Sequence, residues 1–215
     1  MITFYGYFRS SAAYRCRIAL NLKNISYNFS SVHLRRNGGE QNKPEYLAIN
    51  PQGLVPALEI DGVVLTQSLA IIEYLDEVYP SPHLLPHDAV ERANVRAFAE
   101  IIACDTHPLQ NLRVLQYIKQ EYGQPQEAID KWCQNWLSKG LLACEKLLAN
   151  QSHAFNFAFS NAPGLADICL VPQLYAADRF KVDLSDMPRL KAIREACEIL
   201  PAFANAHPDR QPDSE

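Results

Sequence analysis

The chain has 215 residues, of which 48% are hydrophobic and 20% are charged, so it can bury a core and is not intrinsically disordered. Its 20 Lys and Arg residues against 24 Asp and Glu give a formal net charge of −4, so no overall positive field favours nucleic acid or an anionic membrane. No apolar run approaches the roughly 18 residues that a membrane span needs. The start, Met1–Tyr5, reads as a strand and not as a signal peptide. We therefore expect neither a nucleic-acid nor a membrane partner.

Six cysteines are scattered along the chain without a C-x-x-C pair. In a chain of this length their spacing argues against a disulfide scaffold and against a zinc site, so no metal is expected. Most of them lie in apolar, helix-patterned surroundings, where a free cysteine behaves as a small hydrophobic residue. We expect reduced thiols and a cytoplasmic location.

The first part of the chain begins with a strand, a helix and a second strand. Ile2–Tyr7 is a short aromatic and β-branched run, which is typical of a strand. Ser10 and Ser11 are N-cap candidates for a helix that runs to about Asn24. Ser26–Leu34 alternates as a second strand. The helical crossover predicts that the two strands are parallel and that their connection is right-handed.

A hairpin and another helix complete this part. The polar stretch Arg35–Lys43 reads as a loop. Val55–Ile60 and Val63–Thr66 flank Asp61-Gly62, the strongest hairpin signal in the chain. Gln67-Ser68 then begins a helix that reaches Tyr79. The pattern predicts a small α/β domain over residues 1–82.

From about residue 88 onward the patterns are helical, and we expect an all-α domain over residues 88–215. A stripe of apolar residues at helical spacing is interrupted by Pro108, which predicts a kinked helix. Further helices are expected at Gln126–Ala149, Leu165–Arg179 and Pro188–Glu198, and the tail after Pro208 is expected to be disordered. Asp167 is interpreted as a structural helix-capping residue.

The first strand–helix junction has the chemistry of an anion site. Ser10 and Ser11 lie where the strand ends and the helix begins. Their hydroxyls, with the unpaired N–H groups of the first helical turn, could bind a negative group. The competing interpretation is that one serine only caps the helix.

Six blocks of sequence resemble one family, and they span essentially the whole chain. The first block has the pattern Ser-Ser-x-x-x-Arg-x-Arg-Ile-Ala-Leu, which resembles the signature of zeta-class glutathione transferases, the maleylacetoacetate isomerase family. This resemblance implies a thioredoxin-like N-terminal domain that binds glutathione, an all-helical C-terminal domain and a homodimer. The blocks are Ser10–Leu20, Asn50–Leu58, Gln67–Leu75, His107–Leu112, Ala166–Gln173 and Arg179–Leu184, and the end of the chain, His207–Asp213, is also similar.

The resemblance also implies which residues bind glutathione. Ser10 is the first choice for the partner of the thiolate, and Ser11 remains open for that role. The Val55–Pro56 bond is expected to be cis, and His107 and Asn111 are expected to share one face of a helix. The implied glutathione-binding residues are Ser10, Ser11, Ala12, Arg15, Gln41, Gln52, Val55, Pro56, Gln67, Ser68, His107 and Asn111.

One position departs from the family pattern, since Ala12 stands where the family usually has a cysteine. Two explanations stay open. The cysteine is accessory and glutathione alone does the chemistry, or this chain has lost some activity.

For the reaction, the resemblance implies a glutathione-dependent cis–trans isomerase of a small maleyl diketo-acid. The substrate is a dicarboxylate, so fixed cations are needed, and Arg9, Arg113 and Arg179 are the candidates. Arg9 is counted with Ser10 and Ser11 as catalytic. Maleylacetoacetate is the first choice, and maleylpyruvate is close behind. A general glutathione transferase and a non-catalytic glutathione-binding module remain as alternatives.

Overall fold

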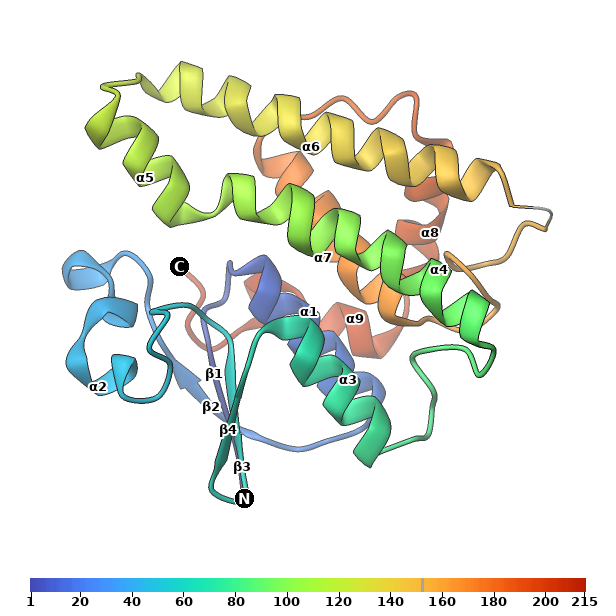
Figure 1. Cartoon of the computed structure of the whole chain (residues 1–215), viewed down its shortest axis with the longest axis horizontal. Coiled ribbons are helices and arrows are strands. Elements are labelled where there is room, and N and C mark those ends of the chain that lie inside the picture. The colour runs from blue at the N-terminus through green and yellow to red at the C-terminus, as the bar shows by residue number, and fades with distance from the viewer. Residues whose placement is uncertain (152) are drawn as a thin grey trace. The chain divides into compact units, whose positions relative to one another are not determined.

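The structure is a computed structural model, and it describes residues 1–151 and 153–215. The chain divides into two compact units (Figure 1). The first contains Met1–His83 together with Leu200–Glu215, and the second contains Leu84–Ile199. The expected boundary is therefore wrong at the C-terminal end, because the last 16 residues belong to the first unit.

The first unit is built on a four-stranded mixed sheet. Its strands are β1 (Ile2–Gly6), β2 (Asn28–Ser31), β3 (Ala57–Ile60) and β4 (Val63–Thr66), in the order β2-β1-β3-β4. β1 and β2 are parallel, and β3 is antiparallel to both β1 and β4. The prediction of a parallel first pair is confirmed.

The β3–β4 hairpin follows the sequence signal closely. Asp61 and Gly62 have φ angles of 49° and 83°, the left-handed backbone that a tight two-residue turn of this kind requires. The register pairs Ile60 with Val63, so the turn consists of these two residues alone.

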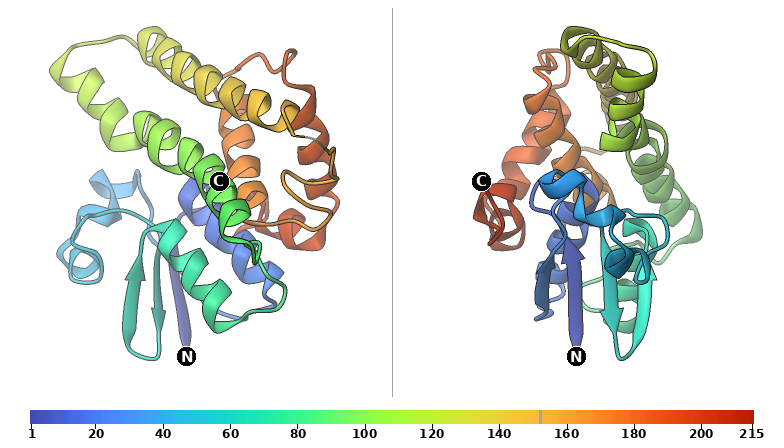
Figure 2. Two further views of the ribbon diagram at one scale, coloured as in Figure 1. Left: turned by 45° about the vertical axis from the view of Figure 1, so that its right-hand side comes forward. Right: turned by 90° about the vertical axis from the view of Figure 1, so that its left-hand side faces the viewer.

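Helices cover both faces of the sheet. Figure 2 shows the short α2 (Pro44–Leu47) on one side and α1 (Ser11–Leu22) with α3 (Ser68–Val78) on the other. The buried side chain of Lys23, at the end of α1, donates to the Asp76 carboxylate at 2.6 Å and to the carbonyl of Tyr79 at 2.6 Å. These bonds fix the end of α1 to the end of α3.

The C-terminal segment packs on α1, which explains its place in the first unit. Helix α9 (Pro201–Ala206) buries Phe203 and Ala206, and α1 and α9 are in contact. Asn21 of α1 donates to the carbonyl of Ala202 at 2.9 Å. The expectation of a disordered tail after Pro208 is wrong, since a short turn, η5 (Pro208–Arg210), and further hydrogen bonds attach it to this unit.

Among its described residues, the second unit contains helices joined by loops and no strand. The expected ranges are found for α6 (Gln126–Ala149), α7 (Leu165–Arg179) and α8 (Pro188–Glu198). α7 is the most buried of these and contacts α4 (Ala89–Glu100), α6 and α8. Among the described residues, no helix is both long and apolar enough to cross a membrane.

The stripe around Pro108 does not form one kinked helix. After α4 the chain passes through a π-helical turn, η3 (Ile101–Thr106), and a 3-10 turn, η4 (His107–Gln110), before α5 (Leu112–Glu121). Proline has no N–H to donate to the preceding turn, so the α-helical hydrogen-bond ladder loses one bond at Pro108. Asn111 is extended, with ψ of 141°, and separates the two segments.

Candidate active site

Ser10 directly precedes α1 and is its N-cap. Its φ and ψ of −69° and 118° are extended, and its Oγ accepts a hydrogen bond from the N–H of Ala13 at 3.2 Å. A hydroxyl that accepts one bond still has its own proton to donate. Ser10 therefore combines the capping role with a donor for a further acceptor, so the two interpretations of this residue are compatible.

The other predicted residues of α1 are buried. Ser11 is the first helical residue and is 9% exposed, and Ala12 and Arg15 are also buried. Ser10 is half-buried. By exposure, Ser10 is the better placed of the two serines to meet a bound anion.

The turn before Ser10 carries Arg9. The N–H of Ser10 donates to the carbonyl of Tyr7 at 3.0 Å, which closes the turn. The guanidinium carbon of Arg9 lies 5.4 Å from the centre of the Phe8 ring. Burial raises the pKa of the Tyr7 hydroxyl, while the positive charges of Arg9 and Arg35 act in the opposite direction. Arg9 is thus a half-buried cation one residue from the helix N-terminus.

The segment before β3 has the expected cis peptide bond between Val55 and Pro56. The side chains of Tyr46 and Asn50 both donate to the carbonyl of Leu54 at 2.7 Å and hold the preceding turn. The β1–β3 ladder begins at Ala57, so the backbone of Val55 lies outside it.

The structure brings Gln52 and Gln67 together. The Gln67 amide donates to the Oε1 of Gln52 at 2.7 Å, and both side chains are exposed. Gln67 has a φ of 70°, and Ser68 follows as the buried first residue of α3. A polar amide pair therefore lies at the N-terminus of α3, where a carboxylate is stabilised.

Gln41 is buried against Gly39. A Cβ on Gly39 would come within 2.6 Å of the Gln41 amide oxygen, so a larger residue there would displace this side chain. The Oε1 of Gln41 has no hydrogen-bond partner among the described residues. A buried amide oxygen without a hydrogen-bond partner can accept a hydrogen bond from a donor group of a ligand.

In the second unit, His107 and Asn111 do not share a face of a regular helix, so that prediction is wrong. His107 opens η4, and Asn111 follows this 3-10 turn and caps α5. The Oδ1 of Asn111 accepts from the N–H of Arg113 at 3.2 Å, which leaves its NH₂ group as the donor.

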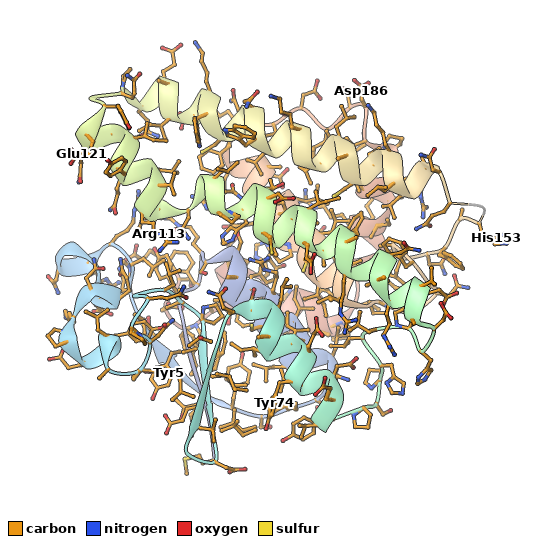
Figure 3. The ribbon with its side chains drawn as sticks, in the orientation of Figure 1. Tyr5, Tyr74, Arg113, Glu121, His153 and Asp186 are labelled. Carbon is orange, nitrogen blue, oxygen red and sulfur yellow. The ribbon has the colours of Figure 1, made fainter. Side chains whose placement is uncertain are left out.

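The two remaining arginines are exposed and come from different helices. Arg113 lies in the first turn of α5 (Figure 3). Arg179 is the last residue of α7, and its guanidinium carbon lies 5.5 Å from the Phe180 ring centre.

A cavity of about 360 Å³ lies in the first unit between the strands and the α2 region. It contains none of the predicted site residues. Its lining consists of Tyr5, Ser30, Ser31, Val32, Glu40, Lys43, Glu45, Tyr46 and Ile49.

Comparison with known proteins identifies the family. Residues 4–83 match the glutathione S-transferase N-terminal domain. The chain is 48% identical to maleylacetoacetate isomerase of Pseudomonas aeruginosa, over 98% of this chain and 97% of that one, and 47% identical to maleylpyruvate isomerase of a Ralstonia species, over 98% of each. The holo structure of a bacterial zeta-class maleylpyruvate isomerase superposes with a TM-score of 0.97 at 46% identity and covers 99% of this chain and all of that one. This chain belongs to the zeta class of glutathione transferases.

A second similar structure, of maleylacetoacetate isomerase from Methylobacterium extorquens, holds glutathione and malonate. It has a TM-score of 0.94, is 42% identical to this chain and covers 99% of each. The resemblance seen in the six sequence blocks and the expected fold, a thioredoxin-like domain followed by a helical one, are both confirmed.

One candidate ligand-binding residue is not among those predicted from the sequence. Gln110, beside Asn111, is 9% exposed, and neither atom of its amide has a hydrogen-bond partner among the described residues. A buried amide without partners is costly unless a ligand satisfies it. The sequence carries no signal for this residue, because its lack of partners depends on how distant side chains pack around it.

Proposed function

We propose that this chain is a glutathione-dependent cis–trans isomerase of a small maleyl diketo-acid, with maleylacetoacetate as the first candidate. The observation that carries the proposal is the Ser10 hydroxyl at the start of α1, which accepts from the N–H of Ala13 and keeps its own proton for a sulfur anion. Full-length relatives near 48% identity with this isomerase name support the substrate class.

The polar groups of the chain fit a tripeptide with two carboxylates. The Oε1 of Gln41 is buried and has no protein partner among the described residues. The Gln52–Gln67 pair precedes the N-terminus of α3 and suits the γ-glutamyl end. The proposed glutathione residues are these three with Ser10, Ser11, Ala12, Arg15, Val55, Pro56, Ser68, His107 and Asn111.

Bound glutathione would supply the thiol that adds to the cis double bond and leaves again after the bond has rotated. Such a step needs a thiolate, and a free thiol has a pKa near 8.5. Lowering the thiol pKa by about two units requires about 2.7 kcal/mol of preferential stabilisation of the anion. The Ser10 hydroxyl and the N-terminus of α1 together supply a contribution of that order.

The arginines act on the substrate. Arg9, Arg113 and Arg179 can bind carboxylates in a bidentate way and stabilise the negative charge that develops on the carbonyl oxygen. Arg9 is the first choice because it adjoins Ser10 and is half-buried. Ala12 offers no thiol, so the proposed chemistry relies on the sulfur of glutathione alone.

Maleylpyruvate is the second candidate substrate, since a maleylpyruvate isomerase is 47% identical to this chain. The purified protein should be mixed, with glutathione, with maleylacetoacetate, maleylpyruvate and a chloro-nitro-aromatic electrophile in turn. The proposal predicts a much higher kcat/KM for a maleyl diketo-acid than for conjugation. Conjugation without isomerisation would instead identify a general transferase, and no reaction in any arm would favour a non-catalytic module.

We also propose a homodimer in the cytoplasm. The support is the family resemblance and, for the location, the six cysteines, all of which are free thiols. Light scattering coupled to gel filtration tests the dimer, since a single mass near 24.3 kDa would refute it.

A further inference from the structure

We infer that Asp213, near the C-terminal end of the chain, is a positioning residue for the Arg9–Ser10 turn. The Oδ2 of Asp213 accepts hydrogen bonds from the N–H of Phe8 at 3.1 Å and from the Oγ of Ser31 at 2.9 Å. Phe8 directly precedes Arg9, and Ser31 ends β2. One carboxylate therefore bridges the two parallel strands at their carboxyl ends, just before the turn that carries the proposed site.

The carbonyl side of the same turn is held by a buried arginine. The guanidinium of Arg17 donates to the carbonyl of Phe8 at 2.9 Å, to that of Tyr7 at 3.4 Å and to that of Ala206 at 3.0 Å. Burial lowers the pKa of Arg17 to about 10, so it is still charged at neutral pH. Both backbone groups of Phe8 are thus fixed by charged side chains, one from α1 and one from the tail.

The tail itself is anchored on both sides of Asp213. Before it, the amide of Gln211 donates to the carbonyls of Asn205 and His207, each at 2.9 Å. After it, the Glu215 carboxylate lies 3.1 Å from the Nε2 of His33 and 2.8 Å from the guanidinium of Arg36. These contacts on either side of Asp213 hold its carboxylate in position beside Phe8.

His33 links this anchor to the turn. Its Nδ1 accepts from the N–H of Arg36 at 2.9 Å, which assigns the proton of the neutral ring to Nε2 and makes it a donor to Glu215. The Tyr7 ring packs edge-on against both His33 and Phe8, with centroid distances of 4.8 and 4.7 Å. The tail therefore contacts His33 through Glu215, and His33 in turn packs against the Tyr7 ring.

The consequence for chemistry follows from the geometry of Ser10. Its N–H is bonded to the carbonyl of Tyr7, so a shift of the Tyr7–Phe8 backbone moves the Ser10 hydroxyl and the neighbouring Arg9. A displacement of about 1 Å in a positioned group can lower a rate by about a hundredfold. None of the proposed glutathione residues lies in the tail. The affinity for glutathione should therefore fall less than kcat when the contact with the tail is lost.

The inference rests on the proposed binding of glutathione at Ser10, and Asp213→Ala tests it. We expect kcat for isomerisation to fall about tenfold, with a smaller change in the KM for glutathione. The pH at which bound glutathione becomes a thiolate should rise, because the hydrogen bond from the Ser10 hydroxyl to the sulfur is no longer well aligned. Asp213→Glu should recover part of both losses, and Asp209→Ala, a change at an exposed carboxylate of the same tail, is the matched control.

Amide hydrogen exchange keeps the test independent of the proposed activity. In Asp213→Ala the N–H of Ser10 should exchange at least about tenfold faster than in the native chain, and in Asp209→Ala it should not. If Asp213→Ala lowers only the unfolding temperature, and leaves the Ser10 exchange rate, the thiolate titration and kcat unchanged, the inference is wrong. If the native chain binds no glutathione but its Ser10 exchange depends on Asp213, the proposed function fails and the positioning role stands.

Discussion

Ser10 is the residue on which the proposed chemistry depends most. Its replacement by alanine removes the hydroxyl that would donate to the sulfur, so we expect the thiol pKa of bound glutathione to rise by about one unit or more. The thiolate absorbance of the complex, measured against pH, checks this. The same change removes an N-cap and should cost about 1 kcal/mol of stability, which urea unfolding will separate from the pKa effect.

Ser11→Ala is the matched variant, because Ser11 is buried one residue away. It should leave the titration nearly unchanged. A titration that moves with Ser11 and not with Ser10 would reassign the role.

For the substrate, the corresponding prediction concerns Arg9. Arg9→Ala should lower kcat/KM for the diketo-acid by about tenfold to a hundredfold, the range expected for hydrogen bonds to a charged group. The KM for glutathione should change little. Steady-state kinetics with each reactant varied in turn measures both effects.

The control for Arg9 is Arg210→Ala, an exposed arginine outside the proposed site. Equal losses in the two variants would mean that net charge, and not a placed guanidinium, governs the rate.

Asp167 is buried and structural, as its sequence position at the start of a helix predicts. Its two oxygens accept from the N–H groups of Ala158 and Gly164, each at 2.8 Å. Burial raises its pKa to about 6, and the backbone donors lower it less than burial raises it. A carboxyl whose folded pKa lies above its unfolded value stabilises the fold most below the unfolded value, and this contribution is lost as pH rises through about 6.

We therefore expect the stability of the native chain relative to Asp167→Asn to fall as pH rises from 4 to 7, by about 3 kcal/mol at most. Urea unfolding at both pH values measures the difference. Asp186→Asn, at an exposed carboxylate, is the control. A difference that does not change with pH would place the folded pKa of Asp167 at its ordinary value.

These residues also differ in whether their roles can be predicted from the sequence. Ser10 as a cap and Asp167 as a capping partner were predictable, because their bonds are to residues a few positions away. Gln110 was not, since its lack of partners depends on how side chains distant in the sequence pack around it.

At the scale of elements, the close approach between η3 and α6 makes a distinct prediction. A Cβ on Gly140 would overlap the Thr106 hydroxyl, which donates to the carbonyl of Ile101 at 2.7 Å. Gly140→Ala should therefore destabilise the second unit by about 1 to 3 kcal/mol through overpacking.

Thr106→Ala in the same chain should recover part of the loss, because it removes the colliding group, and a double-mutant cycle in urea measures the coupling. Additive losses would show that the overlap is relieved elsewhere. Asn135→Ala, at an exposed position on the same helix, is the control for a substitution in α6.

Elements differ in how well the sequence predicts them. The helices α6, α7 and α8 were found at their expected bounds, since each has a continuous apolar period. The segment from His107 to Asn111 was expected to be part of one kinked helix and was not. Pro108 predicts a break in the hydrogen-bond ladder, but the π and 3-10 turns that replace it are set by packing against α6, which a local pattern does not contain.

At the scale of the whole chain, the last 16 residues belong to the first unit, whereas the sequence pattern predicts that they belong to the helical domain. The sequence has no signal that α9 packs on α1, because the contact joins residues about 180 positions apart. The same long-range contacts place Asp213 beside Phe8. The parallel strands, the hairpin and the crossover helix were predictable, since each depends on neighbouring segments of sequence.

The most direct test of the central claim is the initial rate of maleylacetoacetate isomerisation by the whole chain as glutathione is varied, with total glutathione measured before and after. We expect a rate that is negligible without glutathione, saturates as it is added and leaves its amount unchanged. An equal rate without glutathione, or its stoichiometric consumption, would contradict a mechanism that uses the tripeptide's sulfur as a returning nucleophile.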